Sequence, residues 1–136
     1  MFNYPLTAAV TLLALLVYIW VTTRVGKARA TYEVKAPEMS GPDEFNRVMR
    51  VHANTIEALI MFLPVLWIYA LTISDLYAAA IGLFFPIGRV LFALGYYVAA
   101  DKRGKGFMVG FLSTIVLLIG SIIGTGQLIW SQYFAI

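Results

Sequence analysis

Residues 106–136, GFMVGFLSTIVLLIGSIIGTGQLIWSQYFAI, contain no charged side chain. A helix that crosses a bilayer needs about 20 largely apolar residues. This stretch therefore predicts a membrane-spanning helix over about 106–134, with enough residues to allow tilt. The whole chain agrees with this, because its 136 residues are 61% hydrophobic and 12% charged and have a mean hydropathy of +0.83. Such a composition lies outside the range of water-soluble globular domains.

Three further apolar stretches precede this one, and only one charged residue, Arg89, lies inside the third of them. We expect spans at about 3–23, 47–74 and 76–100. The segment 25–49 is polar and contains Pro37, which predicts a loop that leads to a helix start at Asp43 or Glu44. The prediction is an all-α integral membrane protein: one domain, residues 1–136, folded as a bundle of four transmembrane helices.

Positive charge is concentrated in two of the three connections. Loop one carries Arg24, Lys27, Arg29, Lys35, Arg47 and Arg50, and loop three carries Lys102, Arg103 and Lys105. The positive-inside rule then places loops one and three in the cytoplasm of a multi-pass protein, and it applies equally to a bacterial inner membrane and to a microsomal membrane. Topology explains the net charge of +3 without a nucleic-acid partner.

Sulfur and metal chemistry are constrained by composition. The chain has no cysteine, which excludes a disulfide framework, a thiolate metal site and a cysteine nucleophile, so a reacting thiol must come from a ligand. His52 is the single histidine, and it points about 140° away from Arg47 on a helical wheel. We therefore expect no metal site.

The segment RVMRVHANTIE, residues 47–57, carries polar side chains into an apolar helix. Arg47, Arg50, Asn54 and Glu57 fall within an arc of about 80° on a helical wheel. A carboxylate at this depth is costly unless it faces the bundle interior and has a cationic partner. One interpretation is a structural ion pair between Glu57 and Arg89. The other, which the number of polar groups favours, is a site for a zwitterionic or multiply charged ligand.

The third span places Phe85, Arg89, Phe92 and Tyr96 on a common face. Tyr96 fits two hypotheses equally, a ligand-facing residue and an aromatic side chain of the membrane interface. In the fourth span, small residues recur in two patterns that allow close helix approach within or between subunits, Gly106-x-x-x-Gly110 and Gly120-x-x-x-Gly124. Because four narrow helices enclose little space, we expect a site shared between subunits.

The run GPDEFNRVMRVHANTIE, residues 41–57, together with Gly88-Arg89 and Tyr96, resembles the membrane-associated proteins in eicosanoid and glutathione metabolism, the MAPEG family. The similarity covers essentially the whole chain and is close to the glutathione transferase and leukotriene synthase branches. The resemblance implies a homotrimer of four-helix subunits that binds glutathione as co-substrate between neighbours, near the cytoplasmic face.

The resemblance also implies roles for individual residues. Positions that hold the carboxylates and amino group of glutathione match Arg50, Asn54 and Glu57; a ligand tyrosine matches Tyr96; and a basic position supplied by the adjacent subunit matches Arg29. The catalytic arginine of the leukotriene synthase branch matches Arg103, whereas the spacing in other branches indicates Lys105.

These assignments predict an enzyme in which a guanidinium lowers the pKa of the glutathione thiol, by about 1–3 units. The thiolate would attack hydrophobic electrophiles that arrive from membrane lipid, and reduction of lipid hydroperoxides is a second expected activity. Three positions depart from the family pattern: Phe92 and Ala58 replace hydrogen-bonding residues, and Ala53 argues against prostaglandin E synthase activity. The alternatives are a non-catalytic lipid-presenting protein of the same fold and a small transporter gated by Glu57 and Arg89.

Overall fold

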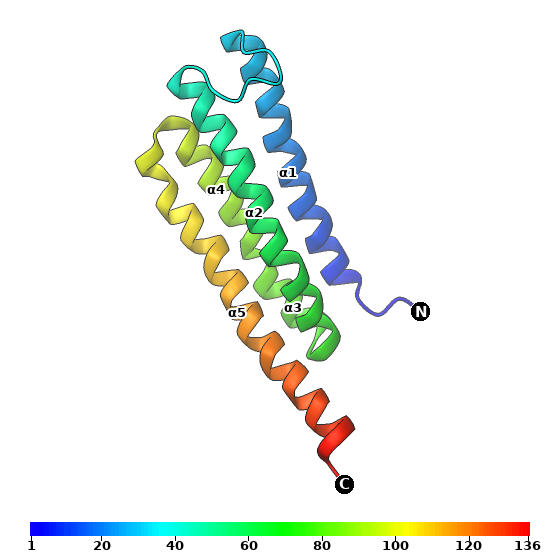
Figure 1. The fold of residues 1–136 in the computed structure, drawn as a ribbon. Coiled ribbons are helices and arrows are strands. Elements are labelled where there is room, and N and C mark those ends of the chain that lie inside the picture. The colour runs from blue at the N-terminus through cyan, green and yellow to red at the C-terminus, as the bar shows by residue number, and fades with distance from the viewer.

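The computed structural model describes all 136 residues, and its regular structure is entirely helical (Figure 1). In chain order the elements are α1 (Pro5–Tyr32), α2 (Asp43–Thr72), α3 (Asp75–Gly82), α4 (Phe84–Val98), the short helix η1 (Ala100–Arg103), α5 (Gly104–Ile129) and the final turn η2 (Trp130–Phe134). Four helical units are long and apolar enough to cross a membrane, with α3 and α4 together forming the third and η1 to η2 the fourth. The predicted fold class is confirmed.

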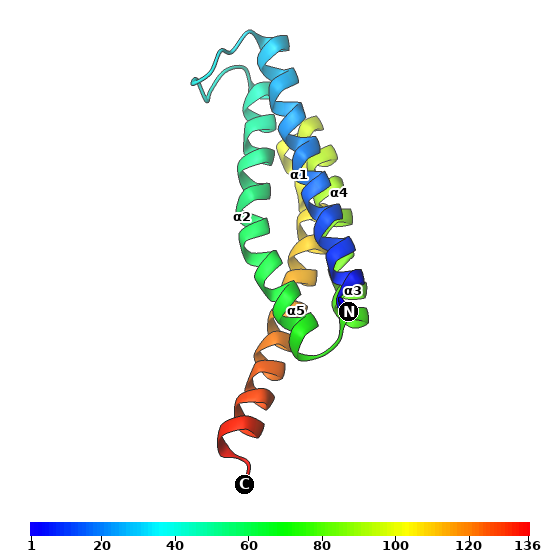
Figure 2. The ribbon, with the colours of Figure 1, turned by 90° about the vertical axis from the view of Figure 1, so that its right-hand side faces the viewer.

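The helices lie alongside one another in an elongated bundle (Figures 1 and 2). The loop 33–42 and the η1 turn between α4 and α5 lie at one end. We call it the charged end because the Lys and Arg residues of the chain, apart from Arg89, lie in these connections and in the adjoining parts of the helices. The N-terminus and the α2–α3 turn lie toward the other end, where the last part of α5 extends beyond the remaining helices.

Helix α1 continues nine residues past the expected end of its span and stops at Tyr32. The prediction ended this span at residue 23 because charged residues begin there, but Lys, Arg and Ala are good helix formers in water. Charge marks the end of the lipid-soluble part of the helix and not the end of the helix. Glu33, with a left-handed φ of 55°, terminates α1.

The third span is divided at Leu83, between α3 and α4. Pro86 explains the division, because proline has no N–H and its ring crowds the carbonyl four residues earlier, which belongs to Gly82. Ser113 of α5 donates a hydrogen bond to the carbonyl oxygen of Ile81 at 2.7 Å, which supplies a partner for the backbone next to the division. Pro64, by contrast, lies within an uninterrupted α2.

The first turn of α1 is capped by a residue from a distant part of the chain. Asp75 accepts a hydrogen bond from the backbone N–H of Thr7 at 2.8 Å and another from that of Leu6 at 3.2 Å. These amides belong to the group that has no partner inside a helix, and a carboxylate also suits the positive end of the helix dipole. Asp75 thereby fixes the start of α1 against the start of α3.

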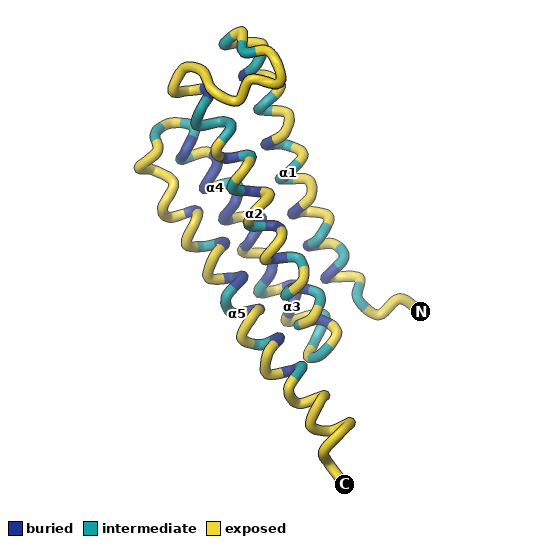
Figure 3. Tube along the Cα trace, viewed as in Figure 1, coloured by how far each residue is buried: buried dark blue, intermediate teal, exposed yellow.

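Exposed residues occur along the whole length of the bundle (Figure 3), and many of them are large apolar side chains. Leu12, Ile60 and Ile122 are 62%, 69% and 64% exposed, an arrangement that water would penalise and lipid permits. The interior is packed around stacked rings of Phe62 and Phe85, whose centroids are 3.9 Å apart. The bundle is therefore built for an apolar solvent.

Small residues of α5 pack against α4 within the same subunit. A Cβ on Gly106 would lie 2.1 Å from the backbone nitrogen of Phe92, and one on Gly88 would lie 2.5 Å from the nitrogen of Gly110. Backbone atoms cannot yield as a flexible side chain can. The first small-residue pattern therefore serves helix packing inside the subunit.

We predict that Gly106→Ala destabilises the bundle by about 1–3 kcal/mol, because the added methyl must push α5 away from α4. Thermal unfolding of the detergent-solubilised protein measures this as a lower midpoint. The matched control is Gly126→Ala, where a Cβ meets nothing within 4 Å. An unchanged midpoint for Gly106→Ala would show that the close approach of the two helices is not required.

Candidate functional site

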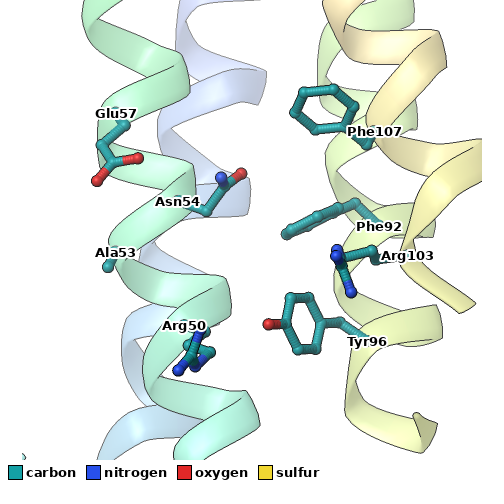
Figure 4. A pocket seen from close by; sticks show the side chains of 8 residues that line it. All are labelled: Arg50, Ala53, Asn54, Glu57, Phe92, Tyr96, Arg103 and Phe107. Atoms are coloured by element: carbon teal, nitrogen blue, oxygen red, sulfur yellow. The ribbon is translucent and has the colours of Figure 1, made fainter. Parts of the chain in front are cut away.

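A groove of about 580 Å³ opens in the half of the bundle near the charged end, between α2, α4 and the η1–α5 segment (Figure 4). This volume lies within the range of small-molecule sites. The lining residues are Arg50, Ala53, Asn54, Glu57, Phe92, Tyr96, Arg103 and Phe107. Residues far apart in the sequence therefore meet around one space.

Helix α2 supplies the polar stripe of one wall. Arg50, Asn54 and Glu57 are spaced four and three residues apart, so they project from one face of the helix. In Figure 4, Asn54 points across the groove toward Phe92. Its Oδ1 atom is buried and has no hydrogen-bond partner. A buried acceptor without a partner is costly, so a ligand donor that the amide turned to meet would relieve this cost.

The opposite wall combines aromatic rings with a guanidinium. Tyr96 of α4 is only 8% exposed, and Phe92 packs edge-on against it with ring centroids 5.5 Å apart. Arg103 lies over the Tyr96 ring with its Cζ 5.4 Å from the centroid. One of its terminal nitrogens donates to the carbonyl oxygen of Ala100, which holds the side chain in place and leaves other N–H groups free.

Arg89 lies behind this wall and does not pair with Glu57. Its Nη2 atom donates to Thr55 Oγ1 at 2.9 Å, its Cζ lies 4.1 Å from the ring centroid of Phe92, and the residue is 2% exposed. Thr55 and Glu57 are two residues apart and so point about 160° away from each other around α2. Glu57 therefore lies at the rim of the groove, with its carboxylate exposed and turned away from Arg89 (Figure 4).

Arg29 lies outside the groove of its own subunit. It donates to the carbonyl oxygens of Glu38 at 2.7 Å and Val34 at 3.3 Å, and its Cζ is 5.5 Å from the ring centroid of Phe45. These contacts hold the loop 33–42 against α1 and the start of α2. Lys105 is exposed and does not line the groove either.

His52 contacts α1 and not the groove. Its Nε2 atom shares a hydrogen bond with the hydroxyl of Tyr18 at 3.2 Å. The structure contains no group of three or more His, Cys, Asp or Glu side chains able to hold a metal ion.

Charge in the groove favours a ligand with more than one acidic group. Two guanidinium groups, one carboxylate, one amide and one phenol line the groove. Arginine side chains bind carboxylates through paired hydrogen bonds and stay charged at every relevant pH. The groove can therefore hold a zwitterion with excess negative charge and stabilise an anion near Arg103. Sequence reasoning did not identify Phe107 as a lining residue, since an apolar side chain in an apolar span gives no signal.

Comparisons with known proteins give a consistent result. The model of the MAPEG family matches residues 7–123. An uncharacterized Synechocystis protein is 43% identical over 116 residues, 85% of each chain. Human microsomal glutathione S-transferase 2 is 36% identical over 118 residues, 85% of this chain and 80% of the relative. Rat leukotriene C4 synthase is 38% identical over 98 residues, 72% of this chain and 65% of the relative.

We predict that Thr55→Val destabilises the protein by about 1–3 kcal/mol, because it removes the hydrogen-bond acceptor of a buried guanidinium. Thermal unfolding in detergent measures the loss. Thr22→Val is the matched control, since Thr22 is exposed and bonds only to its own helix, to the carbonyl of Tyr18. Equal effects of the two substitutions would mean that Thr55 does not hold Arg89.

Proposed function

The chain belongs to the MAPEG family, and on this premise we propose that it is a membrane-bound glutathione transferase that joins the glutathione thiolate to hydrophobic electrophiles. Glutathione-dependent enzymes among its relatives support a family-level enzymatic function. The observation that carries the specific proposal is the convergence of Arg50, Asn54, Glu57, Tyr96 and Arg103 on one groove.

Glutathione complements this groove in charge. The tripeptide carries two carboxylates, one ammonium group and a thiol. In the proposed complex Arg50 pairs with a carboxylate, Glu57 pairs with the ammonium group, and Asn54 Oδ1 accepts from an N–H group of the ligand. Tyr96 packs against the peptide and offers its hydroxyl as a further hydrogen-bonding group.

Arg103 is the proposed activator of the thiol. A free thiol of this kind has a pKa near ~8.5, and only the thiolate is a good nucleophile. A guanidinium that donates to the sulfur favours the anion and lowers the thiol pKa by about 1–3 units. Arg103 is preferred to Lys105 because Arg103 lines the groove and Lys105 does not.

In the proposed reaction, the thiolate sulfur attacks an electrophilic carbon of a substrate that enters from the bilayer past Phe107. A carbon–sulfur bond forms and the bond to the leaving group breaks, with the electron pair departing on that group. For a lipid hydroperoxide, the sulfur instead attacks the terminal oxygen. A second glutathione then completes the two-electron reduction to an alcohol, water and glutathione disulfide.

A homotrimer is part of the proposal. Glu57 is exposed in the single subunit although it lies well inside a helix long and apolar enough to cross the membrane. An ionised carboxylate facing lipid is strongly disfavoured, so a neighbouring subunit must cover this side of the groove. Arg29 of that neighbour is the proposed additional ligand, since its guanidinium retains free N–H groups. We place the charged end in the cytoplasm, following the positive charge of its loops.

A non-catalytic protein that presents a lipid is the second candidate. Phe92 and Phe107 make part of the groove apolar, which would suit an acyl chain. Glutathione-dependent activity distinguishes the two candidates, because a lipid-presenting protein has no use for a thiolate.

We predict that adding glutathione to the purified protein at neutral pH produces the ultraviolet absorbance of a thiolate. Arg103→Ala should raise the pH at which this band appears by about 1–3 units, because the positive charge that stabilises the thiolate is lost. Turnover at neutral pH should fall more than glutathione affinity. Absorbance titration and steady-state conjugation kinetics measure both quantities.

Lys102→Ala is the matched control for this prediction, since it removes a cation of the same connection that does not line the groove. Loss of the band in Lys105→Ala but not in Arg103→Ala would transfer the role to Lys105. Absence of both a band and binding in the unaltered protein would favour the lipid-presenting candidate.

We also predict that Glu57→Gln raises the KM for glutathione by about 10-fold or more with a smaller effect on kcat, because it removes a charge-assisted hydrogen bond to the ammonium group. Conjugation kinetics at varied glutathione concentration measure the two constants. Glu38→Gln, in the loop 33–42, provides the control with the same change of charge. A KM unchanged by Glu57→Gln would place the ammonium group elsewhere.

A further inference from the structure

A second groove lies between α1 and α4, with a volume of about 360 Å³. Its lining is apolar: Leu13, Val17, Leu83, Pro86, Ile87, Val90 and Leu91. On α4, Ile87 and Val90 lie on the face opposite Phe92 and Tyr96, which line the candidate glutathione site. The two grooves are therefore separated by the body of α4.

The face of α1 that lines this groove continues toward the charged end. Leu13, Val17, Trp20 and Arg24 are spaced four, three and four residues apart, which places them on one face of the helix. At 1.5 Å per residue, Arg24 lies about 16 Å along the axis from Leu13. This length is comparable with that of an acyl chain running from the interface toward the bilayer centre.

Aromatic and cationic side chains gather where this face reaches the charged end. The Cζ of Arg24 lies 4.5 Å from the ring centroid of Tyr97, and the Trp20 ring packs edge-on against Tyr97 at 6.1 Å between centroids. Arg47 approaches from α2, with its Nε donating to the backbone carbonyl of Tyr97 at 3.4 Å. Three helices thus meet around one tyrosine.

The guanidinium of Arg24 has no acidic partner. It packs on a ring face and forms neither a hydrogen bond nor an ion pair with any residue of the chain, so its N–H donors remain available. Arg47 keeps its terminal nitrogens free while Nε is engaged. The hydroxyl of Tyr97 is buried and also lacks a hydrogen-bond partner. The cluster is therefore rich in donors and has no compensating anion.

We propose that this is a binding site for an anionic phospholipid, with the phosphate at Arg24 and Arg47 and an acyl chain in the groove between α1 and α4. Guanidinium groups bind phosphate through paired hydrogen bonds, and basic pockets between transmembrane helices at the cytoplasmic side select anionic headgroups. Trp20 and Tyr97 are of the residue types that favour the membrane interface. The site is distinct from the proposed glutathione site and does not depend on it.

Bromine on a lipid acyl chain quenches a nearby tryptophan and so reports binding at this groove. In a chain carrying Trp67→Phe and Trp130→Phe, Trp20 is the remaining tryptophan. We expect brominated phosphatidylglycerol to quench it at about 30-fold lower lipid fraction than brominated phosphatidylcholine, since each of the two cations contributes about 1 kcal/mol. Arg24→Gln alone should reduce the preference to about fivefold and Arg24→Gln combined with Arg47→Gln should abolish it, whereas Lys35→Gln, with the same change of charge as one of these in the loop 33–42, should retain it.

Equal quenching by the two lipids with Arg24 present would overturn the proposal and leave only unselective contact with the bilayer. Retention of the full preference in the chain that carries both Arg24→Gln and Arg47→Gln would overturn it equally. Native mass spectrometry of the unsubstituted protein, exchanged into detergent with equal amounts of the two lipids, provides a measurement that needs no substitution. Preferential retention of phosphatidylglycerol supports the site, and equal retention contradicts it.

Discussion

A guanidinium inside a lipid-embedded bundle must find polar partners within the protein, and much of the site geometry follows from how Arg89 does so. Arg89 donates to Thr55 Oγ1 and lies over the ring of Phe92. This contact requires α2 to present Thr55 to α4. The helical period then turns Arg50, Asn54 and Glu57 away from Arg89 and toward the groove. Arg89 does not line the groove, but its contact with Thr55 thereby orients the face of α2 that would bind the ligand.

Close packing of α5 on α4 completes the other wall. Because Gly106 has no side chain, the backbone of α5 approaches that of Phe92, and the short η1 helix is sufficient to join the two elements. The same approach places Arg103 over Tyr96 and brings Phe107 to the groove. Helix packing and site construction therefore share the same few residues, so a substitution at Gly106 would alter both.

The sequence predicted the four spans well, because apolar length is a property that each segment shows by itself. It underestimated α1, since charge ends the lipid-soluble stretch but not the helix. It placed Arg47, Arg50, Asn54 and Glu57 in one polar stripe of α2, but Arg47 does not line the groove and bonds to the carbonyl oxygen of Tyr97 instead. It also offered Arg89 as a partner for Glu57. A helical wheel shows which residues share a face of one helix, but it does not show which face packs against the next helix. Thr55 was therefore overlooked as the partner of Arg89. Phe107 was missed because its environment depends on tertiary packing alone.

Asp75 carries a consequence for the order of assembly. Its carboxylate satisfies the first amides of α1 from 68 and 69 residues away in the chain. During synthesis the first helix is made long before Asp75. Until the third span has been inserted, the N-terminal amides of the first helix must therefore form hydrogen bonds with water or lipid headgroups. The contact can close only after the hairpin of α2 and α3 is in place. These hydrogen bonds therefore form late in assembly. They fix the position of the first helix along the membrane normal once the other helices have been inserted.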